Sequence, residues 1–404
     1  MSDTVRVIVS MGVRKTAAKS TPLNSMLRLS FCALLVFSPS GFAADSGDEK
    51  SSVIRVAISR NTAQFRLKTS GDVYALELKT GQKYMLLGRS AYDIKFISPT
   101  RLAVAGATLQ SPVKLLAADG GERITLNGRF YKGDIYIQTA VDEKLEVIEH
   151  LSLEDYLCGV LPKEMSPDWP LEALKAQAVA SRTYALKNVN PKKDYDMTDG
   201  VDTQVYIGAS GVNARIIDAV NSTRGEVLKY KGRLLTAFFH ACCGGATTGP
   251  GSVWGEDAVK PLSGAKDPFC SPSRHYKWDF YATTRDLLTF IQKQGSSALK
   301  IKGVSVYKRD RSGRAVRLRF VTDRGSFTVK TSDLRKAFGS YDIKSTLITR
   351  LTRSNGGYEF TGRGWGHGVG MCQEGAKFMA YKGRDYKKIL RQYYPGASIK
   401  DIND

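Results

Sequence analysis

The sequence predicts an α+β protein: an N-terminal antiparallel β unit, then a mixed α/β domain with an inserted α/β subdomain. Short segments between residues 53 and 147 alternate apolar and polar residues, with Gly or Pro between them, as antiparallel strands do. An Ala-rich segment follows, in which Leu171, Leu174 and Ala178 fall near the 3.6-residue period of a helix. Residues 283–350 then return to strand-like runs mixed with short helical ones, which predicts the insertion.

Residues 1–44 have the pattern of an export signal. Arg28 precedes an apolar run at 29–37, and mostly small residues follow it. The run is too short to span a bilayer comfortably. Bacterial lipid attachment at Cys32 would require a small residue where Phe31 stands. We therefore expect an exported protein of the periplasm or cell wall, without a stable membrane anchor after cleavage of the signal.

The charge balance favours an anionic partner. The chain has 60 Lys and Arg residues against 39 Asp and Glu, a formal net charge of +21. A field of that sign attracts nucleic acid, acidic lipid or an acidic wall polymer. Because no zinc-finger, RRM or homeodomain pattern is present, we expect no nucleic-acid partner.

Residues 153–188 organise the rest of the chain. They place one carboxylate, Glu164, in a predicted turn punctuated by Pro and Gly, directly before the Ala-rich helix. Pro170 suits the start of that helix, and Ser166 or Asp168 is the expected cap. Apolar neighbours such as Met165 would raise the pKa of a buried carboxyl, as a general acid at neutral pH requires.

Three motifs resemble, in order, those of the SpoIID/LytB family. They are GVLPKEMSPDWPLEALKAQAVASRTYA at 159–185, TDGVDTQVYIG at 198–208 and GRGWGHGVGMCQEGA at 362–376. That family includes lytic transglycosylases, which cut the glycan strands of peptidoglycan. The resemblance implies that Glu164 is the catalytic acid and base, giving 1,6-anhydro-muramyl ends with no cofactor required for catalysis.

The first two motifs also supply candidate sugar-binding residues. Arg182 and Tyr184 follow Glu164 along the helix and are expected to orient the carboxylate or bind sugar, with an ordinary helix ion pair as the alternative for Arg182. Asp202, Gln204 and Tyr206 alternate, so one face of a short predicted strand would present all three. The alternative for these three is a turn cap followed by a strand.

The third motif is rich in glycine. Glycine occupies every second position from Gly362 to Gly370, which permits unusual backbone conformations and close approach to a ligand. The resemblance places this loop at the substrate cleft. Trp365, His367 and Gln373 are therefore expected to bind substrate.

A further cluster offers metal ligands or a disulfide. The H-x-C-C and C-x4-H spacings suit a structural zinc ion, and some members of the resembled family bind zinc at about this point. A Cys243–Cys270 disulfide and free thiols are the alternatives. On a strand, Cys242 and Cys243 would face opposite sides and could not easily bind one metal ion, so Cys242 is not among the expected zinc ligands. The expected zinc ligands are His240, Cys243, Cys270 and His275.

Two alternatives to a lytic transglycosylase remain. One is a non-catalytic wall-binding or amidase-enhancing module, acting with a wall amidase. The other is a hydrolase that pairs Glu164 with Asp155, Asp168 or Asp202, because glycoside hydrolysis usually uses two carboxylates.

The expected organisation, after the signal, has four parts. A β-rich region (45–147) is followed by the first part of the catalytic core (148–282), the inserted subdomain (283–350) and the C-terminal part of the core (351–404).

Overall fold

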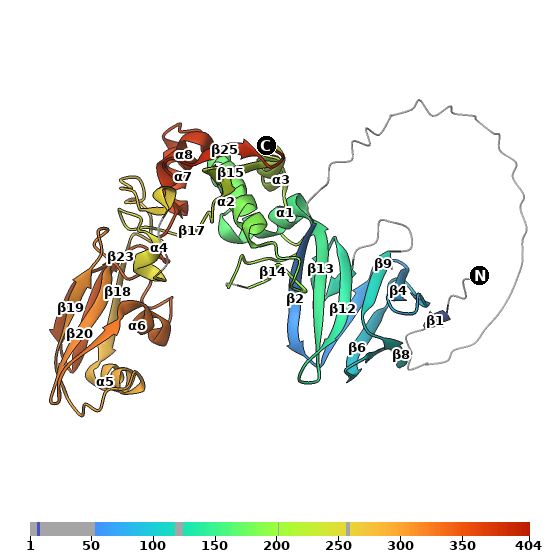
Figure 1. Ribbon diagram of the computed structural model, residues 1–404, viewed down its shortest axis with the longest axis horizontal. Helices are drawn as coiled ribbons and strands as arrows, with labels where there is room; N and C mark the ends of the chain where they lie inside the picture. The colour runs from blue at the N-terminus through green and yellow to red at the C-terminus, as the bar shows by residue number, and fades with distance from the viewer. Residues whose placement is uncertain (1–5, 9–52, 118–123, 201, 256–258) are drawn as a thin grey trace, which may run out of the picture.

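The computed structural model describes residues 6–8, 53–117, 124–200, 202–255 and 259–404. The predicted signal run at 29–37 lies outside these residues. The described chain is α+β, as expected, and Figure 1 shows its main helices between the β unit at one end and the insertion at the other. None of its described helices is long and apolar enough to cross a membrane.

The N-terminal β unit is present and is almost entirely antiparallel. One sheet has the order β1-β5-β4-β9-β12-β13-β2-β14, and a second has the order β11-β10-β3-β6-β7-β8. The unit ends at Ser152 rather than at residue 147, because β13 continues to that point. The strands are β1 (Arg6–Ile8), β2 (Val53–Thr62), β3 (Gln64–Thr69), β4 (Val73–Glu77), β5 (Lys83–Leu86), β6 (Ala91–Ser98), β7 (Arg101–Val104), β8 (Ala107–Gln110), β9 (Val113–Ala117), β10 (Ile124–Leu126), β11 (Arg129–Tyr131), β12 (Asp134–Ala140) and β13 (Lys144–Ser152).

The chain passes from β13 directly into helix α1 (Leu153–Glu164), where we had expected a turn. The Ser152 hydroxyl caps this helix by accepting the Asp155 N–H, and the later Pro162 does not stop it. Helix α2 (Leu171–Asn188) follows as predicted. Its N-cap is Pro170, with no side-chain cap bond, so the expected caps Ser166 and Asp168 are wrong.

Small residues let α2 pack closely on several neighbours. Ala173, Ala176 and Ala180 have no exposed surface, and the helix contacts α1, α3, α7, α8 and β15. The remaining elements of this central region are β14 (Met197–Thr198), α3 (Ala214–Asn221), β15 (Glu226–Tyr230), β16 (Arg233–Leu234), β17 (Phe239–His240), α4 (Pro250–Val253), the 3-10 turn Lys260–Leu262, β24 (Met371–Cys372), α7 (Gln373–Tyr381), α8 (Tyr386–Tyr393) and β25 (Ser398–Asp401).

The insertion has a hydrophobic core of its own. Two three-stranded sheets, β18-β23-β22 and β19-β20-β21, enclose buried side chains such as Trp278, Leu318 and Phe360. This core takes in strands on both sides of the predicted 283–350 limits. Its elements are β18 (Lys277–Thr283), α5 (Thr284–Lys293), β19 (Ile301–Arg309), β20 (Ala315–Thr322), β21 (Gly325–Lys330), α6 (Thr331–Phe338), β22 (Ile348–Ser354) and β23 (Gly357–Arg363).

Candidate functional site

Glu164 is the last residue of α1, at the point where the chain leaves the helix. The next residue, Met165, is buried and closes the helix by donating its N–H to the Leu161 carbonyl. Burial is the largest influence on Glu164 and raises the pKa of its carboxyl. The Gln373 side chain and the Val205 N–H donate to this carboxyl, which lowers the pKa in part. Burial outweighs the two donors, so the pKa of the Glu164 carboxyl stays above its usual value.

The partner of Glu164 comes from a distant part of the chain. Gln373 is the first residue of α7, and its Nε2 lies 3.1 Å from Glu164 Oε2. The same nitrogen lies 3.3 Å from Oε1 of Gln177, whose own Nε2 donates to Ser181 over 2.9 Å. Gln177 has no exposed surface and was missed from the sequence. A glutamine on the buried face of an Ala-rich helix was the signal that would have found it.

Arg182 lies in the core, where solvent does not reach it. Its guanidinium donates two hydrogen bonds to the Glu154 carboxylate, over 2.9 and 2.7 Å, and has no exposed surface. It also donates to the carbonyls of Val220 and Glu226. The ion-pair alternative therefore describes this residue, which ties α2 to α1 and α3.

The three alternating residues are not presented by a strand, because residues 204–207 form an irregular segment. Tyr206 is buried and donates to Glu149 over 2.7 Å. Gln204 is also buried and accepts from the Tyr156 hydroxyl over 3.1 Å. Asp202 is exposed instead, and pairs with Arg60 at 3.6 Å. The expected single sugar-binding face is wrong, and the segment's link to Glu164 is the Val205 N–H.

Tyr184 and His367 meet at an aromatic cluster centred on Phe238. The Tyr184 ring lies 6.0 Å from Phe238, which lies 6.1 Å from His367 and 4.7 Å from Trp254. His367 Nε2 donates to the Phe239 carbonyl over 2.9 Å, and Nδ1 accepts the Val369 N–H. Burial lowers the pKa of His367 to about 4. Because both ring nitrogens already form hydrogen bonds and the ring is neutral, His367 would contact a sugar through its ring face or edge.

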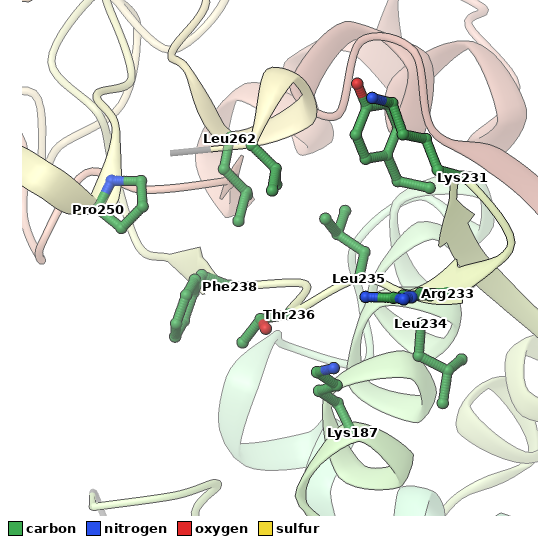
Figure 2. Close-up of a pocket in the computed structure, with 11 residues that line it drawn as sticks. Lys187, Lys231, Arg233, Leu234, Leu235, Thr236, Phe238, Pro250 and Leu262 are labelled. Carbon is green, nitrogen blue, oxygen red and sulfur yellow. The ribbon is translucent and has the colours of Figure 1, made fainter. Parts of the chain in front are cut away.

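A cavity of about 530 Å³ borders the same cluster. Figure 2 shows Lys187, Arg233 and Phe238 on its wall, with Leu235 and Leu262 supplying apolar surface. Lys187 lies one turn beyond Tyr184 on α2. The wall therefore combines cations with apolar groups next to the predicted substrate residues.

Trp365 belongs to a different aromatic group. Its ring lies 4.9 Å from His275, 5.5 Å from Tyr341 and 5.4 Å from the Lys344 ammonium. Its backbone pairs with that of Cys242. The described contacts place Trp365 beside the insertion and do not join it to Glu164.

Cysteine thiols and a carboxylate converge behind the Gly-rich loop. The donor atoms of Cys243, Asp267, Cys270 and Cys372 all lie within 4.8 Å of one another, and all four residues are buried. Cys243 Sγ lies 3.5 Å from Cys270 Sγ and 3.0 Å from Asp267 Oδ2. No two of the described cysteines are joined by a disulfide bond. Such a donor set fits a tetrahedral zinc ion of the structural type.

The two predicted histidine ligands are not in this group. His240 directs Nδ1 toward the Val369 carbonyl at 3.1 Å, and His275 packs edge-on against Trp365. Cys242 does interact with the thiols of Cys270 and Cys372. The expectation that it points away is wrong, because β17 ends at His240 and no strand alternation applies beyond it.

The glycines of the third motif allow the backbone to approach other backbone. Gly364, Gly366, Gly368 and Gly370 all have positive φ. A Cβ on Gly370 would lie 1.9 Å from the Phe238 carbonyl oxygen. Because Gly370 has no side chain, its backbone can lie close to that of Phe238, and β24 pairs with β17. This pairing positions the start of α7, which carries Gln373.

No second carboxylate is paired with Glu164 among the described residues. Asp155 lies in the first turn of the 12-residue helix α1, and Glu164 ends it. At about 1.5 Å per residue the two are roughly 13 Å apart along the axis, beyond the ~5–9.5 Å of paired glycosidase carboxylates. Asp168 is exposed and lies close to Ser166.

Two family profiles match this chain. Residues 141–230 match "Stage II sporulation protein", or SpoIID, a span that contains Glu164, Arg182 and Gln204. Residues 259–370 match a domain of unknown function, DUF8618, which covers the insertion and most of the Gly-rich loop.

Three relatives show how far the similarity extends. An uncharacterised protein of Brachyspira hyodysenteriae is 38% identical over 87% of this chain and 94% of its own length. The Bacillus subtilis "Stage II sporulation protein D" is 31% identical over 63% of this chain and 76% of its own length. The B. subtilis "Amidase enhancer" is 32% identical over 69% of this chain, but over only 45% of its own length.

Proposed function

Because this chain belongs to the SpoIID/LytB family, we propose that it is an exported lytic transglycosylase that cleaves peptidoglycan glycan strands. One observation carries the proposal. Glu164 is a partly buried carboxyl whose pKa is raised, and the partners it has among the described residues, Gln373 and Val205, are both N–H donors. Such a group is suited to giving and then recovering a proton.

The reaction that suits a single carboxyl needs no water. Protonated Glu164 gives its proton to the glycosidic oxygen as the bond from that oxygen to the sugar C1 breaks. The resulting Glu164 carboxylate then takes the proton of the same sugar's 6-hydroxyl, whose oxygen bonds to C1. The products are a 1,6-anhydro end and a free 4-hydroxyl, and the enzyme regains its starting state.

The cysteine cluster adjoins this site through Cys372. We assign a structural zinc to Cys243, Cys270, Cys372 and Asp267, on the convergence of their donor atoms. Cys372 directly precedes Gln373 and caps α7 by accepting the Gly375 N–H. Holding Cys372 in place therefore orients the side chain that donates to Glu164.

Product analysis in water enriched in ¹⁸O tests the reaction class. Purified protein is incubated with sacculi, intact or stripped of stem peptides, and the released fragments are weighed by mass spectrometry. We expect ends that are one water lighter than hydrolysis products and carry no ¹⁸O. Ends containing ¹⁸O would establish a hydrolase instead.

The similarity to the amidase enhancer supports a second candidate, a non-catalytic module that assists a wall amidase. The same incubation is repeated with a cell-wall amidase added. Faster release of stem peptides, with no cleavage of glycan by the protein alone, would favour this second function.

A further inference from the structure

The sheet β19-β20-β21 of the insertion presents a face of cations without acids. None of its three strands contains Asp or Glu. Arg317 pairs across the sheet with Lys330, and Arg319 follows on the same face. Because Leu318 and Phe320 alternate with these cations and are buried in the core, the cations occupy the opposite face, toward solvent. We call Arg317, Arg319, Lys330 and Tyr307 the basic sheet face.

These charges are not neutralised within the described chain. Arg317, Arg319 and Lys330 make none of the ion pairs found among the described residues. The Arg319 guanidinium lies over the Tyr307 ring, 4.0 Å from its centroid, and 54% of Tyr307 is exposed. A cation beside an exposed aromatic ring can bind a carboxylate and a sugar face together.

The basic sheet face is continuous with the predicted cleft. A cavity of about 510 Å³ is lined by Arg317 and Lys330 of this face together with Trp254 and His367. The two acids on its wall, Asp310 and Asp333, are outnumbered by five Arg and Lys residues. Trp254 is 44% exposed and lies 5.2 Å from the His367 ring. A polymer lying along the Gly-rich loop therefore passes Trp254 and continues onto this face.

We propose that the basic sheet face binds the peptide-free glycan strand beyond the cleft, through the carboxylates that muramic acid residues expose once their stem peptides have been removed. The inference rests on the proposed function for the identity of the polymer. Charge complementarity selects an acidic polymer, and the shared cavity selects the strand already held in the cleft. Arg binds a carboxylate with two parallel hydrogen bonds. Arg317 and Arg319 lie two residues apart on one strand, so the sheet holds the two guanidinium groups at a regular spacing.

Binding is measured by fluorescence anisotropy on the full chain carrying Glu164→Gln, so that the strand stays intact. The probe is an end-labelled, peptide-free glycan strand with free carboxyl groups. Two further probes are the same strand with its carboxyls converted to methylamides, and a poly(glycerol phosphate). Arg317→Glu with Arg319→Glu tests the face. Arg285→Glu with Lys293→Glu on α5 makes the same change in net charge elsewhere on the insertion.

We expect the face pair to weaken binding of the free-carboxyl strand about tenfold at low salt, and the α5 pair by less than about twofold. The methylamide strand should bind the parent protein weakly. Its affinity for the variant with Arg317→Glu and Arg319→Glu should be the same. Thermal unfolding of each variant checks that it is folded, and Arg317→Gln with Arg319→Gln should give an intermediate loss.

Equal affinity of the parent and the face pair, or an equal loss in the α5 pair, overturns the inference. Tighter binding of the phosphate polymer than of the free-carboxyl strand also overturns it, in favour of a phosphate-bearing polymer. Cleavage by the chain with Glu164 intact is measured separately. Failure of the proposed reaction would therefore be seen as absent cleavage, whatever the binding result.

Discussion

At the scale of single residues, two opposed influences set the state of Glu164. Burial disfavours the ionised carboxylate, whereas the donors from Gln373 and Val205 favour it. Burial is the larger, so the pKa is raised. The Gln373 donor holds Glu164 Oε2 in place, so the carboxyl is oriented both when it gives its proton to the glycosidic oxygen and when it takes one from the 6-hydroxyl.

The first prediction concerns Glu164→Gln, which keeps the shape and the acceptor oxygen but removes the titrating proton. Release of anhydro-muropeptides should fall about a hundred- to ten-thousand-fold, the usual value of general acid–base assistance. The unfolding temperature should change little. Asp168→Asn, at an exposed carboxylate four residues on, is the control and should retain activity. An unchanged rate in Glu164→Gln would remove this residue from the reaction.

The second prediction concerns Gln373→Met, tested through the pH profile of kcat/KM. The general acid must be protonated, so activity falls as pH rises through the Glu164 pKa. Gln373 lowers that pKa by donating to the ionised form. Its removal should therefore move the descending limb to higher pH, in addition to any loss of rate. A limb that stays in place, or moves to lower pH, contradicts the assigned hydrogen bond.

The sequence predicted some of these residues but little of their geometry. Motif resemblance indicated both Glu164 and Gln373, yet no local pattern shows that side chains 209 residues apart share a hydrogen bond. Alternation suggested one face for Asp202, Gln204 and Tyr206, and that failed because the segment is irregular. Tertiary contacts, which periodicity does not encode, decide both cases.

At the scale of elements, the junction of β24 and α7 links the cysteine cluster to the site. The sequence did not indicate that Cys372 and Asp267 belong to this cluster, because spacing arguments favour residues that are close in the chain. Cys372 reaches the cluster only because β24 pairs in parallel with β17, placing Cys372 opposite His240. The cluster is thus formed by a pairing between distant segments.

The third prediction follows from that junction. Cys270→Ser should lower the bound zinc, measured by elemental analysis, and the unfolding temperature by roughly 5–10 °C. Cys158→Ser changes a thiol on α1 outside the cluster and should leave both unchanged. A strong chelator should reproduce the Cys270→Ser result in the parent. A parent protein that contains no metal, and in which reduction exposes two additional titratable thiols, would instead establish the Cys243–Cys270 disulfide.

The fourth prediction compares two glycines with similar backbone. Gly370 and Gly383 have φ of 71° and 73°. A Cβ on Gly370 would meet the Phe238 carbonyl oxygen at 1.9 Å, whereas one on Gly383 would meet nothing within 4 Å. Gly383→Ala should cost about 1 kcal/mol from backbone strain. Gly370→Ala should cost about 3 kcal/mol or more in denaturant unfolding. Equal costs would show that β24 does not need its close approach to β17.

At the scale of the whole molecule, the part of the chain that the structure describes has two hydrophobic cores. The first runs from the β unit through α1 and α2 to α8, so the predicted β-rich region shares its core with the helices. The second belongs to the insertion. Sequence periodicity predicted the strands of both cores. Only the packing shows that the β unit and the helices share one core, and that the insertion has a separate one.

The last prediction tests that separation by calorimetry. Leu174 on α2 and Leu318 on β20 have no exposed surface and belong to different cores. Truncating a buried Leu to Ala typically costs about 2–5 kcal/mol. If the cores unfold as separate units, the parent should show two heat-capacity transitions. Leu318→Ala should lower only one of them and Leu174→Ala only the other. The two units still share contacts, since Arg314 of the insertion donates to the Cys243 carbonyl over 2.7 Å. A single transition lowered equally by both substitutions would show that such contacts couple the cores into one cooperative unit.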